Sequence, residues 1–159
     1  MSRALGPKLV VSADEIAVSA DDIVRRSIDL AHADRGQRVS VAGPESLAAL
    51  ISLCREGFDH VECARRSTCP CADEASDLLL IAGLLPAADL ADLLRRTCRL
   101  LRDGGTLIVQ LQRSADDAAV RSALAAAGVV TTSSRIDGRA ACLAVHTVAR
   151  AALALRQAS

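Results

Sequence analysis

Aromatic side chains are almost absent from this sequence. Phe58 is the only aromatic residue among 159, and the chain has no Trp and no Tyr. Aromatic rings usually stack on bases or adenine and anchor protein interfaces. Because apolar residues still make up 51% of the chain, the shortage does not prevent a core from forming. It does limit the ways in which the chain can hold a planar ligand.

The chain also lacks an excess of positive or negative charge, and it lacks long apolar runs. The chain carries 19 basic and 19 acidic side chains, so its formal net charge is zero. This balance argues against nucleic acid or an anionic membrane as the main partner. No apolar run approaches the ~20 residues of a membrane-spanning helix, and the first residues lack the features of a secretion signal. We therefore expect a cytoplasmic protein whose six cysteines are reduced.

Apolar periodicity predicts an alternation of helices and strands along the chain. Helical spacing is found over residues 20–34, 44–56, 87–102 and 114–127. Strand patterns are found over residues 38–42, 58–64, 77–85, 106–111, 129–135 and 140–148. Such alternation is typical of a parallel sheet with helices on both faces, and Asp137-Gly138 predicts a closing hairpin. The predicted fold is α/β: a three-layer, doubly wound, mostly parallel sheet with an antiparallel C-terminal hairpin strand.

One domain accounts for the whole pattern, since no linker is visible. We expect it to consist of a helical N-terminal extension (1–36), a core (37–148) and a tail (149–159). The extension contains a short internal sequence repeat, and each copy of the repeat carries a capping box. The two boxes pair Ser12 with Glu15 and Ser19 with Asp22. The second box predicts the start of the first helix.

Glycines and one serine predict where the other helices end and begin. The expected helix-ending positions are Gly36, Gly57, the Gly104-Gly105 pair and Gly128. Ser114 is expected to cap the last helix, with acidic residues in its first turn.

Two helices have well-defined predicted faces. In the helix over 44–56, the spacing i, i+3, i+4, i+7 predicts a core-facing side made of Leu47, Leu50, Ile51 and Cys54. In the helix over 87–102, a basic side is interpreted as solvated. That side consists of Arg95, Arg96, Arg99 and Arg102.

Residues 77–111 combine a buried strand that begins with Asp77, a helix, the paired glycines and a second buried strand. This stretch resembles the middle of a class I S-adenosylmethionine-dependent methyltransferase. The resemblance extends over about residues 38–148. It implies that family's seven-stranded sheet, in which the strand that begins with Asp77 matches the fourth strand. It also implies a site for S-adenosylmethionine at the carboxyl ends of the strands.

The resemblance places the cofactor loop at residues 41–46. Gly43 is the only glycine of this loop, whereas the family normally has several there. Pro44 lacks an amide donor, and Glu45 lies by a helix N-terminus, where it either faces a cofactor amine or satisfies the helix dipole. Glu62 is the candidate for holding the ribose hydroxyls, with a solvated strand-end carboxylate as the alternative.

The resemblance places the remaining site positions after the fourth strand. These cofactor-side positions are Ala82, Gly83 and Leu84, followed by Leu85. They carry no polar or aromatic group that could orient a nucleophile, so no catalytic residue is named. Methyl transfer depends mostly on positioning of the two reactants, so a site without polar or aromatic side chains does not exclude this activity.

Cysteines gather in one part of the sequence. Cys54, Cys63, Cys69 and Cys71 occur within eighteen residues, with His60 among them. Four soft ligands suit zinc, but the spacing lacks any C-x-x-C pair, and we expect no metal. Cys69 and Cys71 follow two arginines, which favour the thiolate form, so redox activity at these positions and at Cys63 stays open. Cys98, Cys142 and the three histidines are interpreted as structural.

Two functions remain open from the sequence. The first is a degenerate methyltransferase-like domain that acts as a non-catalytic binding or regulatory module, with a protein partner or as a homo-oligomer. The alternative is an active S-adenosylmethionine-dependent methyltransferase acting on a small molecule or protein. The single glycine of the cofactor loop and the shortage of aromatic rings both favour the first, because fold alone does not imply activity.

Overall fold

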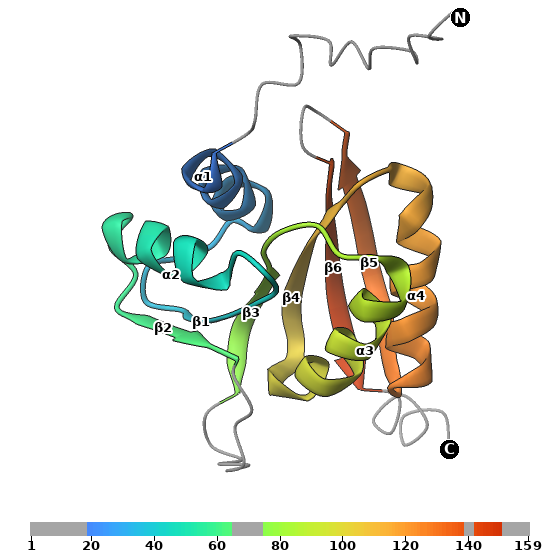
Figure 1. Ribbon diagram of the computed structural model, residues 1–159. Coiled ribbons are helices and arrows are strands. Elements are labelled where there is room, and N and C mark those ends of the chain that lie inside the picture. The colour runs from blue at the N-terminus through green and yellow to red at the C-terminus, as the bar shows by residue number, and fades with distance from the viewer. Residues whose placement is uncertain (1–18, 65–74, 139–141, 151–159) are drawn as a thin grey trace, which may run out of the picture.

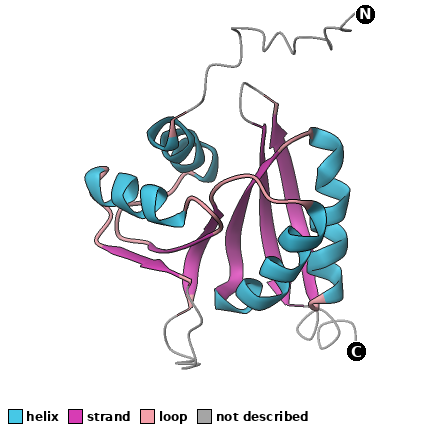
Figure 2. Cartoon of the chain, in the orientation of Figure 1, coloured by secondary structure: helices cyan, strands magenta, loops and turns pink. Residues whose placement is uncertain are grey.

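The computed structural model describes residues 19–64, 75–138 and 142–150. The helices are α1 (Ala20–Ala31), α2 (Ser46–Arg55), α3 (Ala87–Thr97) and α4 (Asp117–Ala126), with short 3-10 helices η1 (Cys98–Leu100) and η2 (Ser114–Asp116). The strands are β1 (Arg38–Ala42), β2 (His60–Cys63), β3 (Ser76–Ile81), β4 (Leu101–Leu111), β5 (Val129–Asp137) and β6 (Cys142–Arg150). Helices and strands alternate as the sequence predicts (Figure 2).

The strands form one sheet in the order β2-β1-β3-β4-β6-β5. The pairs β1–β2, β1–β3 and β3–β4 are parallel, and β6 runs antiparallel to both of its neighbours. The predicted α/β fold with a mostly parallel sheet and a C-terminal hairpin is therefore confirmed. The described residues form six strands, one fewer than the resemblance implies, and residues 65–74 lie outside them. The strand order reverses between β1 and β3, which is the topological switch point.

The sheet is covered on both faces. Figure 1 shows α1 and α2 on one face and α3 and α4 on the other. Successive residues of β3 therefore point into different halves of the core: Leu78 and Leu80 toward α1 and α2, Leu79 and Ile81 toward α3 and α4. All four are at most 2% exposed, which explains why the strand appears in the sequence as a continuous apolar run.

The first helix begins as predicted and ends earlier than predicted. The N–H of Asp22 donates to the Ser19 hydroxyl (3.2 Å), so the second capping box does open α1. The expectation that Gly36 ends this helix was wrong. His32 takes the left-handed conformation (φ 49°), and the N–H of Ala33 donates to the carbonyl of Ile28 (3.0 Å). The helix therefore ends at Ala31, five residues before the glycine.

The predicted stop at Gly104-Gly105 was also wrong. The helix predicted over 87–102 ends at Thr97, and both glycines lie inside β4. Pairing with β3 accounts for the early end, since Leu101 lies opposite Ser76 in the sheet. An ion pair between Arg102 and Asp77 (2.5 Å) holds the same region in extended conformation. The basic side predicted for one helix is therefore divided among α3, η1 and β4.

Ser114 does not cap the last helix. It is the first residue of η2, and neither η2 nor α4 begins with a side-chain cap. The acidic first turn of α4 serves a different purpose, because Asp117 is buried and bonded to His146 of β6.

The predicted core face of α2 was wrong. The buried residues of the helix are Ala49, Ser52 and Leu53. The residues predicted to be buried, Leu47, Leu50, Ile51 and Cys54, form what we call the α2 stripe, of which Leu50 alone is half-buried and the rest are exposed. The small residues decide the orientation, because they let α2 approach the sheet closely and let the Ser52 hydroxyl donate to Asp21 of α1 (2.5 Å).

Some expectations fall outside the described residues. These are the first capping box (Ser12 with Glu15), Cys69 and Cys71, and the end of the tail from residue 151. None of the helices in the described ranges is long and apolar enough to span a bilayer.

The orientation of α2 predicts a contrast between two leucines. Leu53 is 1% exposed and Leu47 is 58% exposed. Replacing Leu53 with alanine leaves a cavity in the core and is expected to lower the free energy of unfolding by about 2–5 kcal/mol. The matched change Leu47→Ala should cost less than about 1 kcal/mol. Urea unfolding of both variants measures the difference, and the reverse ranking would show that the other face of α2 is buried.

Candidate functional site

Two loops meet at the switch point of the sheet. One joins β1 to α2 and the other joins β3 to α3. The N–H of Ala82 donates to the carbonyl of Ala42 (2.8 Å), and the N–H of Glu45 donates to the carbonyl of Ala82 (3.1 Å). The N–H of Gly83 donates to the side-chain oxygen of Gln110 on β4 (3.1 Å). Backbone bonds therefore hold both loops together at the carboxyl ends of three neighbouring strands.

The two loops touch through their glycines. Gly43 has φ +102°, and a Cβ there would lie 2.3 Å from the carbonyl oxygen of Ala82. Gly83 has φ +94°, and a Cβ there would lie 2.6 Å from Cγ of Pro44. Glycine is required at both positions, since side chains are disfavoured at this φ and have no room. The loops are thus in direct contact, with the ring of Pro44 against Gly83.

A cavity of about 350 Å³ opens beside this contact, on the α3 side. It is lined by Gly43, Pro44, Leu85, Asp89, Asp92, Leu93 and Arg96. Its volume lies at the low end of ligand pockets, roughly 300–1,000 Å³. Arg96 forms an ion pair with Asp92 (2.9 Å), and both side chains are more than half exposed. Such a pair stabilises little and remains open to exchange with a charged ligand.

Most of the site residues that the sequence predicts come together here. Gly43, Glu45, Ala82 and Gly83 belong to the two touching loops, and Leu84 follows with 46% of its surface exposed. Glu45 is the N-cap of α2 but makes no side-chain capping bond. The cofactor role of these residues stays a prediction.

Glu62 lies on β2, one residue before that strand ends. It lies opposite Ser40 in the sheet, and the Ser40 hydroxyl donates to its Oε1 (3.4 Å). Ser40 precedes Gly43 by three residues, which is about 10 Å along a strand. Ser40 also shares a hydrogen bond with the hydroxyl of Ser76. The described contacts thus tie Glu62 to a pair of buried serines, and its predicted contact with a ribose remains a prediction.

Sequence reasoning missed Gln110 and the acidic residues of α3. Gln110 is the polar residue within the apolar run 107–111, near the end of β4. A polar side chain at that position of a buried strand is a usable signal for a loop contact. Asp89 and Asp92 could have been found by their spacing, since three residues apart on a helix share one face.

A second polar cluster lies between α4 and β6. His146 is fully buried, and its Nε2 lies 2.7 Å from Oδ1 of Asp117. The other carboxylate oxygen accepts a hydrogen bond from Arg121 (3.0 Å), which also donates to Ser134 of β5 (2.5 Å). Burial raises the pKa of the nearby Cys142 thiol, and the charge of Asp117 raises it further. This network joins α4 to both strands of the hairpin, which supports a structural role for His146.

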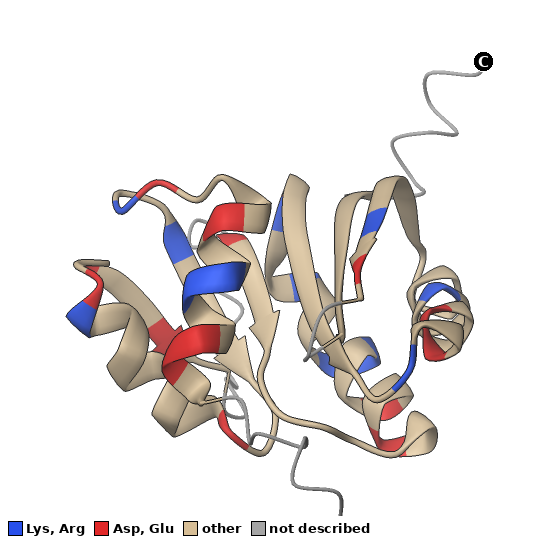
Figure 3. Ribbon diagram, turned by 90° about the horizontal axis from the view of Figure 1, so that it is seen from above, with Lys and Arg blue, Asp and Glu red and all other residues tan. Residues whose placement is uncertain are grey.

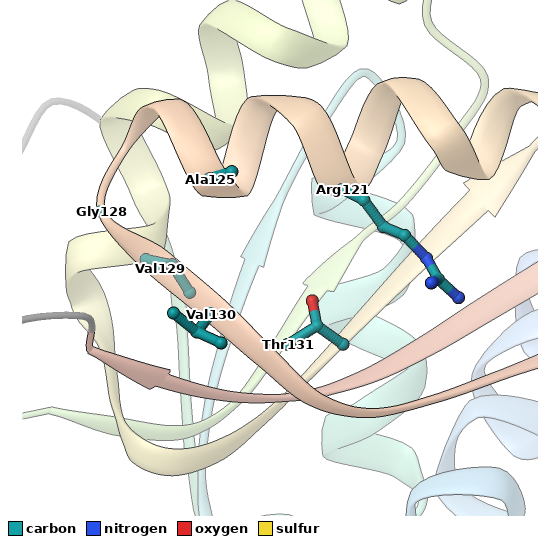
Figure 4. Close-up of a pocket in the computed structure, with 6 residues that line it drawn as sticks. All are labelled: Arg121, Ala125, Gly128, Val129, Val130 and Thr131. Atoms are coloured by element: carbon teal, nitrogen blue, oxygen red, sulfur yellow. The ribbon is translucent and has the colours of Figure 1, made fainter. Parts of the chain in front are cut away.

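A smaller cavity of about 260 Å³ lies between α4 and β5 (Figure 4). It is lined by Arg121, Ala125, Gly128, Val129, Val130 and Thr131. Its one charged group, Arg121, is already engaged by Asp117 and Ser134. The cavity is also away from the switch point, so the loop contact at the end of β1 is the better candidate site.

The cysteines within the described ranges are all free thiols. Cys98 is buried as expected, whereas Cys54 is exposed rather than in the core. In those ranges no group of three or more His, Cys, Asp or Glu is arranged to hold a metal ion.

Comparison with known proteins identifies the fold. No family model matches the chain, and no curated protein matches its sequence. Solved structures do match. An S-adenosylmethionine-dependent O-methyltransferase from Thermotoga maritima aligns with a TM-score of 0.52 at 12% identity, covering 81% of this chain and 71% of that one. A ribosomal protein L11 methylase from Lactobacillus delbrueckii subsp. bulgaricus aligns with a TM-score of 0.51 at 16% identity, covering 82% and 78%. The chain has a class I methyltransferase-like fold.

The loop contact predicts an unequal response to added methyl groups. Gly43→Ala combines an unfavourable φ with a clash against the Ala82 carbonyl, so we expect a loss of about 3 kcal/mol or more. Gly104 has φ +77° with nothing within 4 Å of an added Cβ, so Gly104→Ala should cost only about 1–2 kcal/mol. Chemical denaturation of both variants tests this. Equal losses would mean that the two loops are not in contact.

The buried network predicts a second contrast, between adjacent acids. Asp117→Ala removes the partner of the His146 imidazole and should cost about 1–3 kcal/mol. Asp116 pairs with Arg113 at 3.7 Å near the surface, and Asp116→Ala should cost less than about 1 kcal/mol. Thermal unfolding at neutral pH compares the two variants. A small effect at both positions would contradict the structural role of the network.

Proposed function

We propose that this chain is a methyltransferase-like domain that acts as a non-catalytic binding or regulatory module. The observation that supports this most directly is the contact between the loops after β1 and β3. Ligands of doubly wound sheets bind outside the carboxyl ends of the strands, at the switch point. In this chain Pro44 lies against Gly83 at that place, and the N–H of Glu45 is engaged by Ala82.

The position of the single aromatic residue supports the same proposal. Phe58 is 4% exposed and belongs to the core half under α1 and α2. It is therefore committed to packing and cannot stack on a ligand at the switch point. The neighbouring cavity has two carboxylates and one guanidinium in its lining, all from α3. Any adenine placed there would rest on aliphatic and charged groups alone.

The alternative is an active S-adenosylmethionine-dependent methyltransferase. In its favour, the cavity lies at the carboxyl ends of the strands, and two proteins of similar structure are described as methylating enzymes. In this hypothesis the loops separate to admit the cofactor, and Gly43, Glu62 and residues 82–85 contact it. The acceptor is then a small molecule or a protein.

The hypothesis of a non-catalytic module also requires a partner, and the charge of the chain indicates which class of partner it binds. A protein partner, or a second copy of the chain, fits a molecule with no net charge better than nucleic acid or a membrane surface does. The cytoplasm is the compartment that goes with the free thiols of the described ranges.

A thermal melt with cofactor separates the two functions. We expect no change in the melting temperature with 1 mM S-adenosylmethionine or its demethylated product. A ligand at 100 times its dissociation constant stabilises the folded state by about 2.7 kcal/mol. For a chain of this size, that corresponds to roughly 5–10 °C, so real binding is easily detected.

A clear rise in melting temperature would reject the non-catalytic hypothesis in its simple form. The variant Glu62→Ala then tests the site. Loss of the rise in this variant, with the rise kept in the control Asp59→Ala, would support a ribose contact and the enzyme alternative.

A further inference from the structure

The cavity between α4 and β5 contains a hydroxyl group without a partner. Thr131 is one of the residues that line this cavity of about 260 Å³. Its Oγ1 is buried and makes no hydrogen bond within the part of the chain that the structure describes. A buried hydroxyl without a partner costs stability, and native proteins contain few of them. We therefore expect a polar atom of another molecule to meet this hydroxyl in the cavity.

Arg121 brings unused hydrogen-bond donors to the same cavity. Its Nε–H donates to Asp117 (3.0 Å), and its Nη2 donates to Ser134 (2.5 Å). A guanidinium has five N–H groups, so these bonds leave three of them without a partner among the described residues. The remaining donors include both N–H groups of Nη1. Together with the second N–H of Nη2, they form a fork that matches the two oxygens of a carboxylate.

The guanidinium is fixed in place before any ligand binds. Asp117 is itself bonded to His146 of β6 (2.7 Å), which is fully buried, and Ser134 belongs to β5. Both partners of Arg121 therefore lie on regular elements of the fold. A donor group that is held in this way loses little conformational freedom when a ligand binds, and this favours affinity.

Polar and apolar groups lie at different ends of the cavity. Figure 4 shows the guanidinium of Arg121 and the hydroxyl of Thr131 toward one end, and the side chains of Ala125, Val129 and Val130 toward the other. The cavity thus offers hydrogen-bond donors beside an aliphatic surface. This division suits a ligand with a charged head and a short hydrocarbon chain.

We propose that this cavity binds a small aliphatic monocarboxylic acid in its ionised form. The carboxylate accepts hydrogen bonds from the free fork of Arg121 and from the hydroxyl of Thr131, and the chain of the acid lies against Ala125 and Val129. No carboxylate lines the cavity, so a cation is disfavoured. The charge of Asp117 beside the guanidinium disfavours a dianion such as phosphate.

The size of the cavity indicates a small molecule. Sites for drug-sized ligands measure roughly 300–1,000 Å³, and this cavity is smaller. A protein partner does not fit either, because a stable interface takes about 20–30 residues from each side, whereas six residues line the cavity. Hexanoate, with about eight non-hydrogen atoms, is a suitable probe. So small a ligand is expected to bind with a dissociation constant of about 1 mM.

A titration of the full-length chain with sodium hexanoate tests the proposal by nuclear magnetic resonance. We expect saturable shifts of the Arg121 Nε–H and of the backbone amides of residues 128–131. Hexanamide has the same chain without the charge and should bind at least about tenfold more weakly, because it loses the charge-assisted hydrogen bonds. Sodium chloride at the same concentrations corrects for ionic strength.

Two alanines of α4 provide a matched pair of variants. Ala125 and Ala126 are both exposed, but only Ala125 lines the cavity. Ala125→Leu places a larger side chain in the cavity and should abolish the saturable shifts at residues 128–131. Ala126→Leu adds the same atoms outside the cavity and should leave the dissociation constant unchanged.

Two further variants test the polar end. Thr131→Val removes the hydroxyl and should weaken hexanoate binding severalfold. It should not lower the melting temperature, because this hydroxyl has no partner to lose. Arg121→Gln removes the fork and should weaken binding at least about tenfold. Since Arg121→Gln also breaks two bonds of the folded chain, circular dichroism checks its fold, and the alanine pair gives a test that leaves those bonds intact.

Any of four results would overturn the proposal. These are no saturable shift in the parent chain, equal affinities for hexanoate and hexanamide, binding that survives Ala125→Leu, and shifts confined to the loops after β1 and β3. The cavity shares no residue with those loops, so the titration does not bear on cofactor binding. This proposal and the non-catalytic function therefore fail independently.

Discussion

Burial of β3 on both faces is the constraint on which the rest of the structure depends. Its leucines alternate between two halves of the core, so helices are required on each face of the sheet. The strand also carries the carbonyl of Ala82 and the amide of Gly83 to the end of β1. There the glycines let two backbones approach more closely than any side chain would permit. The same strand thus organises the core and brings the two loops into contact at the switch point.

The strands were the predictable part of this fold. Apolar runs such as residues 77–85 and 106–111 indicate a two-sided strand whatever surrounds them, although the first strand ends at Ile81, and the Asp-Gly turn indicates the hairpin. Helix ends were less predictable, because competing backbone bonds decide them. The bond from Ala33 to Ile28 ends α1 before Gly36, and pairing of Leu101 with β3 ends α3 before the paired glycines.

The orientation of α2 and the state of the site needed three-dimensional information. Periodicity finds an apolar side of a helix but does not say whether small residues on another side fit the sheet better, as Ala49 and Ser52 do. In the site, the sequence identified Gly43 and Gly83 as loop residues. The contact of Pro44 with Gly83, and the bond from Gly83 to Gln110, join segments far apart in the chain. No spacing rule encodes such contacts.

The burial of Phe58 has a practical consequence for spectroscopy. The chain has neither Trp nor Tyr, so its own near-ultraviolet emission is minimal and comes from one ring in the core under α1 and α2. A tryptophan introduced at any chosen position would therefore emit against an almost dark background. One placed beside the loop after β1 would report on that loop, and one placed at the start of α1 would report on the extension. The residue type that the chain lacks becomes its most selective probe.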